Sequence, residues 1–258
     1  MRISSEDVEE LRVAKNILEN PGITAKLTNL VGTPIEKGLD LLPADWQNKV
    51  SAATSDALMT ALKGALLTMG SGTKVANPGW HKIAAAVSGG IGGAFGLPAL
   101  IVELPVSTTI MLRSIADIGR SHGEQLSTAE SQIACLEVFA LGGPSGRDDS
   151  TESGYFAVRS ALARAVTEAS KYLTEKTVVE KGAPALARLI AAIAARFQVQ
   201  VSEKVAAMAV PIIGAVGGGG INLLFINHFQ DMSRGHFVVR KMERKYDQAL
   251  VRDIYESL

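Results

Sequence analysis

The chain has 258 residues, and its 26 basic and 26 acidic side chains give a formal net charge of zero. A neutral chain has no overall positive field to attract a polyanion, so we expect no nucleic-acid partner. Hydrophobic residues make up 47% of the sequence but aromatic residues only 5%, which favours closely packed helices over strands. We therefore predict one all-α domain over residues 1–258, folded as a compact multi-helix bundle.

The cysteine content and the start of the chain bear on its location. Cys135 is the sole cysteine, which excludes an internal disulfide. The first fifteen residues contain acids and bases but no apolar core of the kind that secretion signals carry. We expect a cytoplasmic protein, either free or peripheral to the inner membrane.

The first third of the chain has the pattern of three helices. Apolar spacing predicts an amphipathic helix over residues 5–19, ended by Asn20-Pro21-Gly22, and a second helix over residues 22–39. A third runs from residue 43 to residue 69. The string GSGTK at 70–74 lacks the spacing of a phosphate-binding loop and follows no strand, so we reject nucleotide binding there.

Two long stretches of the chain are nearly free of charge. Between Lys82 and Arg113 the only charged residue is Glu103, and between Lys204 and Asp231 there is none. Each stretch is long enough to cross a bilayer, but both are rich in Gly and Pro and lack basic flanks and aromatic belts. We expect them either to lie buried in the bundle or to insert shallowly into a membrane, with a bilayer span as the less favoured alternative.

Glycines mark both of these stretches. In the first, the glycines at 89, 92, 93 and 96 recur at three- and four-residue spacing, which lets helix backbones approach closely and predicts tight packing. A flexible, membrane-inserting hairpin bounded by Pro98 and Pro105 is the alternative. In the second, four consecutive glycines at 217–220 indicate a hinge or a close backbone contact.

Turn-forming residues divide the rest of the chain. Residues 142–154 are nearly all turn formers and charges, so we predict a loop that joins two halves, 1–141 and 155–258. The helices predicted around it cover residues 105–123, 128–141, 155–181, 184–209 and 221–250. Each half carries the pattern Asp-x-x-Arg-x-His, starting at Asp117 and at Asp231. This echo suggests a duplication whose halves pack with pseudo-two-fold symmetry.

Several blocks of sequence carry a family resemblance. They are 103–109 (ELPVSTT), 113–116 (RSIA), 135–143 (CLEVFALGG), 155–159 (YFAVR) and 235–243 (GHFVVRKME). In this order they resemble the EcsC family over nearly the whole chain, although Asp247 departs from the Tyr-Gly that the family has at this point. The resemblance implies a companion of a bacterial transporter linked to secretion and competence, and it assigns no reaction or ligand.

Polar side chains among the apolar helices are the candidate ligand-binding residues. Glu103 lies in an apolar run, where it either acts as a general acid or base or pairs with a basic side chain. Thr109, Arg113, Asp117 and Arg120 follow on one face of the next predicted helix. That face is either an intrahelical ion-pair ladder or one wall of a site for an anion or lipid headgroup.

The last predicted helix carries further candidates on two roughly opposite faces, which suggests a central helix flanked on both sides. These candidates are Asn227, Asp231, Arg234, His236, Arg240 and Glu243. No spacing typical of a zinc site, a di-iron site or a nucleophile elbow occurs in the sequence. We therefore expect no metal and no other cofactor, and we expect Cys135 to be a buried, inert thiol.

These features favour a non-enzymatic helical protein that associates with the inner membrane surface or binds a lipid or fatty acid. Its apolar helices would contact the acyl chain, and Arg113, Arg120, Arg234 and Arg240 would contact the anionic headgroup.

Two alternatives belong to other functional classes. A hydrolase would use Glu103, Asp117, His236 and Glu243 as acid–base groups, and it requires at least two of them around one substrate. A structural partner of a transporter or secretion apparatus would instead expose an apolar patch.

Overall fold

A computed structural model describes residues 3–19, 23–31, 35–40, 42, 44–68, 97–143, 154–175, 183–209 and 214–258. The helices are α1 (Ser5–Glu19), α2 (Ile23–Val31), α3 (Ile35–Leu39), α4 (Trp46–Thr68), α6 (Leu97–Ser121), α7 (Ala129–Glu137), the 3-10 helix η1 (Val138–Ala140), α8 (Gly154–Glu175), α9 (Pro184–Ala209), α10 (Gly214–Lys245) and α11 (Gln248–Ser257). No strand occurs in these ranges. The predicted all-α, compact multi-helix bundle is confirmed for this part of the chain.

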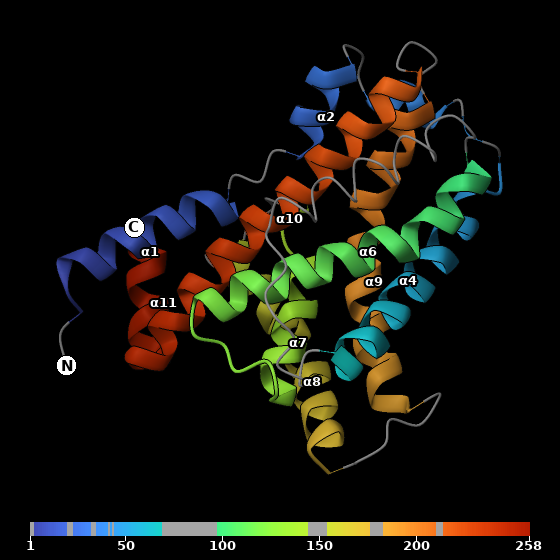
Figure 1. Cartoon of the computed structure of the whole chain (residues 1–258). Helices are drawn as coiled ribbons and strands as arrows, with labels where there is room; N and C mark the ends of the chain where they lie inside the picture. Colours follow the sequence, from blue (N-terminus) through green and yellow to red (C-terminus); the bar gives the residue numbers. More distant parts are fainter. Residues whose placement is uncertain are drawn as a thin grey trace.

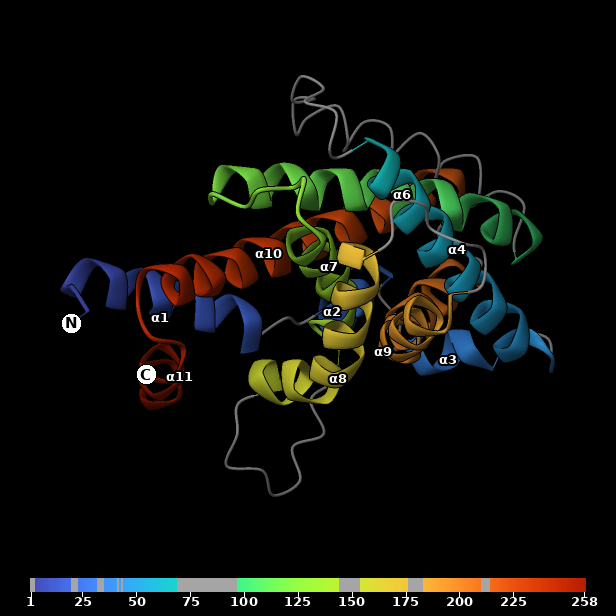
Figure 2. The ribbon, with the colours of Figure 1, turned by 90° about the horizontal axis from the view of Figure 1, so that it is seen from below.

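The longest of these helices, α10, runs through the middle of the bundle (Figure 1). It packs against α1, α2, α6, α9 and α11. Seen from below, α6 lies on one side of α10, and α8 and α11 lie on the other (Figure 2). Because its middle part is covered on several sides, α10 is buried around much of its circumference.

The few aromatic residues gather where α9 and α10 meet η1. The Phe139 ring lies 4.9 Å from that of Phe197 and 5.2 Å from that of Phe229, measured between ring centroids. Phe225 continues the cluster along α10, 5.1 Å from Phe229. All four side chains are buried. Tilted and edge-on ring contacts of this kind add about 0.5–1.5 kcal/mol per pair beyond the burial of apolar area.

Two helix boundaries differ from the sequence prediction. Pro105 was expected to start a helix, but α6 begins at Leu97 and contains Pro105 in its interior. The adjacent Leu104 is fully buried, so tertiary packing keeps the helix continuous although proline removes one backbone hydrogen bond. The Thr109 hydroxyl donates to the Pro105 carbonyl at 2.8 Å.

The prediction of a helix over residues 221–250 is also wrong at both ends. Its first turns extend back to Gly214, so the run of four glycines is helical and not a hinge. At the other end α10 stops at Lys245, and Asp247 caps a separate helix, α11. The Asp247 carboxylate accepts hydrogen bonds from the amides of Ala249 and Leu250 at 3.0 and 3.2 Å. The helix predicted over residues 22–39 is likewise described as two helices, α2 and α3.

Some sequence predictions fall outside the described residues. They are the GSGTK string at 70–74, the glycines at 89–96 and most of the loop 142–154. Among the described helices, α9 alone is long and apolar enough to cross a membrane, and 44% of its most apolar window is buried inside the bundle. This criterion considers only length and composition, and the core helix of a folded domain also meets it.

Candidate functional site

The two helices that carry the sequence candidates, α6 and α10, run in the same direction through the bundle (Figures 1 and 2). Hydrogen bonds between side chains pair Glu103 with Asn222 and Ser114 with Gln230. The partners are 119 residues apart in the first pair and 116 in the second, close to the spacing of 114 in the Asp-x-x-Arg-x-His echo. The two copies of the echo therefore lie on neighbouring, parallel helices.

Glu103 lies in a buried ion pair between three helices. Its carboxylate is 3.1 Å from the Lys204 ammonium of α9 and accepts a hydrogen bond of 3.0 Å from the Asn222 amide of α10. The Lys204 side chain is fully buried and its ammonium lies 5.2 Å from the centroid of the Phe225 ring. The structure thus matches the expectation of pairing with a basic side chain, and the carboxylate is not left as an isolated acid or base.

The remaining α6 candidates lie toward the surface. Asp117 and Arg120 form an ion pair of 2.9 Å, three residues apart, as the ion-pair ladder predicts. Arg113 is exposed, and no contact of its side chain is described. Thr109 is half-buried and donates its hydroxyl to the backbone of its own helix.

On α10 the echo repeats this arrangement only in part. Asp231 and Arg234 form an ion pair of 2.7 Å, also three residues apart and largely exposed. Asn227 is half-buried. The two histidines differ: His122 lies at the exposed end of α6 and contacts the Ile118 carbonyl, whereas His236 is fully buried.

His236 belongs to a polar cluster between α10 and α8. Its Nδ1 atom lies 3.0 Å from the Tyr155 hydroxyl. Burial lowers the pKa of His236 well below 6.5, and the positive charges of Arg240 and Arg159 lower it further. The imidazole is therefore neutral at neutral pH. Burial also raises the pKa of the Tyr155 hydroxyl, which stays protonated.

Two carboxylates share this cluster with His236. Arg159 forms a two-pronged ion pair with Glu243, with N–O distances of 2.6 and 3.1 Å. Burial raises the pKa of Glu137, on α7, against the opposing charges of Arg159 and Arg240. Perturbed groups gathered in this way occur at catalytic sites and also in structural networks.

Glu19 ties the same region to both ends of the chain. Its carboxylate accepts hydrogen bonds of 3.1 Å from the backbone amides of Gly154 and Tyr155, at the start of α8. It also accepts a hydrogen bond of 2.9 Å from the Tyr255 hydroxyl of α11. A carboxylate at a helix N-terminus is favoured both by the free amides and by the helix dipole. One side chain therefore joins α1, α8 and α11.

Arg240 and Arg244 of α10 converge on Glu124, in the turn after α6. Arg240 contacts the Glu124 carboxylate at 2.9 Å and also reaches Glu130 at 3.0 Å. Arg244 contacts the same carboxylate, and the Ser131 hydroxyl donates to it at 2.6 Å. The hydrogen bonds from Arg240 and Ser131 and the charges of both arginines lower the pKa of Glu124 against its burial.

The candidates therefore divide into separate groups. His236 and Glu243 are brought together at α8, whereas Glu103 contacts α9 and the Asn222 side chain of α10. Asn222 precedes His236 by fourteen residues, which is roughly 20 Å along the helix. Asp117 faces Arg120 on the surface of α6. Of the four acid–base groups of the hydrolase hypothesis, His236 and Glu243 lie in one cluster, and Glu103, Asp117 and Glu243 are each held in an ion pair.

The EcsC protein family matches residues 5–242, which is nearly the whole chain. The chain belongs to the EcsC family. No curated protein and no solved structure matches it significantly.

Sequence reasoning missed several partners in this EcsC-family chain. They are Glu19, Glu124, Glu137, Tyr155, Arg159 and Lys204. Tyr155 and Arg159 lie in one of the blocks that carry the family resemblance, which was the available signal. Cys135 is buried as predicted, and burial raises the pKa of its thiol. Within the described ranges, no group of His, Cys, Asp and Glu has the geometry of a metal site.

Proposed function

We propose that this EcsC-family protein associates peripherally with a membrane surface through the charge-poor end of α6 and α10. The observation that carries the proposal is the parallel run of these two helices. From Leu97 to Leu112 the only charge on α6 is Glu103, and from Gly214 to Gln230 α10 has no Asp, Glu, Lys or Arg. Because the helices are parallel, both put these segments at the same end (Figure 1). We call it the charge-poor end.

The one charge that α6 and α10 carry at this end is neutralised inside the protein. Glu103 is buried against Lys204, so it presents no carboxylate to a bilayer. The charged residues of α10 begin at Asp231, which pairs with Arg234. They continue to Arg240, which pairs with Glu124. A pair of helices that is charge-poor at one end and charged at the other suits the interface between an apolar and an aqueous phase.

Exposed apolar side chains supply contact area at the charge-poor end. Leu30 of α2 is 46% exposed and Leu223 of α10 is 38% exposed. The two lie close together, because Leu30 packs over Gly220, one turn before Leu223. Val106, in the charge-poor segment of α6, is also an exposed apolar residue. Transfer of each partly exposed side chain from water to lipid contributes about 1 kcal/mol.

The arginines expected to bind a headgroup are mostly engaged elsewhere. Arg120, Arg234 and Arg240 form ion pairs within the protein. Only Arg113 is exposed without a described contact. The proposal therefore depends mainly on apolar area, and it predicts only a modest preference for anionic over zwitterionic lipid. Accessory action beside a transporter, which the family resemblance implies, is compatible with a membrane-bound position.

Vesicle flotation tests this function. The purified chain should float with phosphatidylcholine/phosphatidylglycerol vesicles, and the double variant Leu30→Glu/Leu223→Glu should bind at least roughly tenfold less, because it loses two apolar contacts and adds two charges. The matched control, Ala249→Glu/Ser257→Glu, adds the same charge on exposed positions of α11, at the opposite end. Equal vesicle binding by the two double variants, or none by the wild type, would refute the proposal.

A further inference from the structure

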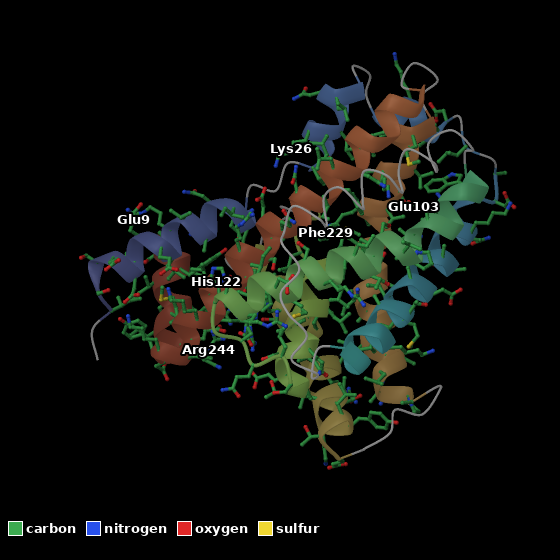
Figure 3. All side chains as sticks on the ribbon, viewed as in Figure 1. Glu9, Lys26, Glu103, His122, Phe229 and Arg244 are labelled. Carbon is green, nitrogen blue, oxygen red and sulfur yellow. The ribbon has the colours of Figure 1, made fainter. Side chains whose placement is uncertain are left out.

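A separate cavity of about 330 Å³ lies between α1, α2 and α10. Its lining combines apolar side chains with a few polar groups, namely Val13, Asn16, Ile17, Lys26, His228, Asp231 and Met232. Figure 3 shows Lys26 on α2, close to where the C-terminal end of α1 meets α10. Three helices that are remote in the sequence therefore build this cavity, and none of the ion-pair clusters described above fills it.

The charges around the cavity favour an anion. Among the described residues, Lys26 forms no ion pair and no hydrogen bond, and its side chain is exposed at the rim. The carboxylate of Asp231 is already held by Arg234 at 2.7 Å. The rim therefore presents one uncommitted cation, together with the Asn16 amide of α1. A carboxylate or phosphate group can accept hydrogen bonds from both of these donors.

The interior of the cavity suits a short apolar body. Val13 is 51% exposed and Ile17 is half-buried, so both present apolar surface that a hydrocarbon chain can contact, whereas Met232 is 1% exposed and belongs to the buried floor. A volume of 330 Å³ equals that of about ten water molecules. This is room for a medium-chain fatty acid of roughly ten to twelve non-hydrogen atoms.

His228 forms the base of the cavity and is held in a fixed position. It is 1% exposed, and it lies against Gly142 at the turn after η1. A Cβ atom at position 142 would come within 2.5 Å of the imidazole Cε1 atom, so only glycine leaves room for the ring. The cavity floor is thus built from the buried core, whereas its rim is open to solvent.

We propose that the α1–α2–α10 cavity binds a small amphipathic anion, a carboxylate or phosphate head on an alkyl chain of about eight to ten carbons. The head contacts Lys26 and Asn16 at the rim, and the chain lies against Val13 and Ile17. This site does not rest on membrane association, because it takes its ligand from solution and lies on a different set of side chains.

Isothermal titration calorimetry without vesicles tests the site. Decanoate below its critical micelle concentration should bind with one-to-one stoichiometry, and decyl phosphate should compete with it. Decan-1-ol, which has the chain without the charge, should bind about tenfold more weakly. Inorganic phosphate alone should give no measurable heat. Equal affinity for decanoate and decan-1-ol, or no binding of decanoate at millimolar concentration, overturns the proposal.

Variants separate the head contact from the chain contact. Lys26→Gln should weaken decanoate about tenfold without changing the affinity for decan-1-ol, whereas the control Lys63→Gln, at an exposed lysine of α4, should change neither. Val13→Trp should narrow the cavity and weaken the binding of both ligands, provided circular dichroism shows native helix content. The single variant Leu223→Glu, which adds no carboxylate beside Lys26, should keep wild-type affinity for decanoate. A Lys26→Gln variant with wild-type affinity overturns the head contact, whatever the vesicle result.

Discussion

Replacing Lys204 by methionine removes the cation that neutralises Glu103 in the core. The Lys204 side chain is fully buried, and its ammonium lies 3.1 and 3.4 Å from the two carboxylate oxygens of Glu103. Methionine keeps much of the length and the contact with the Phe225 ring. The Asn222 amide then remains as the described hydrogen-bond donor to the carboxylate. Breaking a buried pair by removing one partner costs about 3–5 kcal/mol.

Removing both charges should cost much less than the two single changes added together. In Glu103→Leu/Lys204→Met no buried charge is left unpaired, and the main loss is the hydrogen bond with Asn222, about 1–2 kcal/mol. The difference between single and double changes should therefore give a coupling energy of at least about 2 kcal/mol.

Urea unfolding at pH 7, followed by far-UV circular dichroism, measures these free energies. Lys49→Met is the control, because Lys49 forms an exposed ion pair of 2.8 Å with Asp45 and should change stability by less than about 0.5 kcal/mol. The reasoning is refuted if Lys204→Met costs less than about 1 kcal/mol, or if the costs of the two single changes simply add in the double variant.

Three further predictions concern buried groups. Burial lowers the pKa of His236 below 6.5, so below about pH 6.5 the unfolded chain takes up a proton that the folded chain does not. The free energy of unfolding should therefore fall as the pH drops below about 6.5, with this residue contributing up to about 1.4 kcal/mol per pH unit. Urea unfolding at pH 7, 6 and 5 should show a shallower decline in His236→Gln, and identical slopes would contradict this. Gly142→Ala should destabilise by at least about 2 kcal/mol, because φ is 76° and the new Cβ would overlap His228; an unchanged thermal midpoint would contradict it. Iodoacetamide should label Cys135 only at the rate of unfolding, because the thiol is fully buried and its pKa is raised; rapid labelling of native protein, read by mass spectrometry, would show that the thiol is accessible.

Helices were predictable where the pattern is local. The start of α9 at Pro184 and the N-cap of α7 at Thr128 follow from the residue types that occupy the first positions of helices. Pro105 led to a wrong prediction of a helix start, because packing around the buried Leu104 overrides the local preference of proline for the first turn. Asp247 was noticed as a departure from the family pattern, yet its capacity to cap a new helix was the local signal that was missed.

Faces of helices were predictable, but their partners were not. The spacing of His236, Arg240 and Glu243 placed them on one side of α10, and two of them do meet α8. Their actual partners, Tyr155 and Arg159, lie more than eighty residues earlier in the chain. Long side chains bridge α8 and α10 at this point, and periodicity carries no information about which helices will meet.

The Glu19 carboxylate has a consequence for synthesis. It belongs to α1, but two of its three hydrogen bonds are made at the start of α8 and the third comes from Tyr255 of α11, 236 residues later. On the ribosome α1 is made long before these partners, so the contacts of Glu19 stay incomplete until α11 has emerged. The apolar stripe of α1 that packs on α10 stays uncovered until α10 has been made. Nascent chains of this EcsC-family protein therefore expose an apolar helix face until α10 covers it, and α11 then adds the last contact of Glu19.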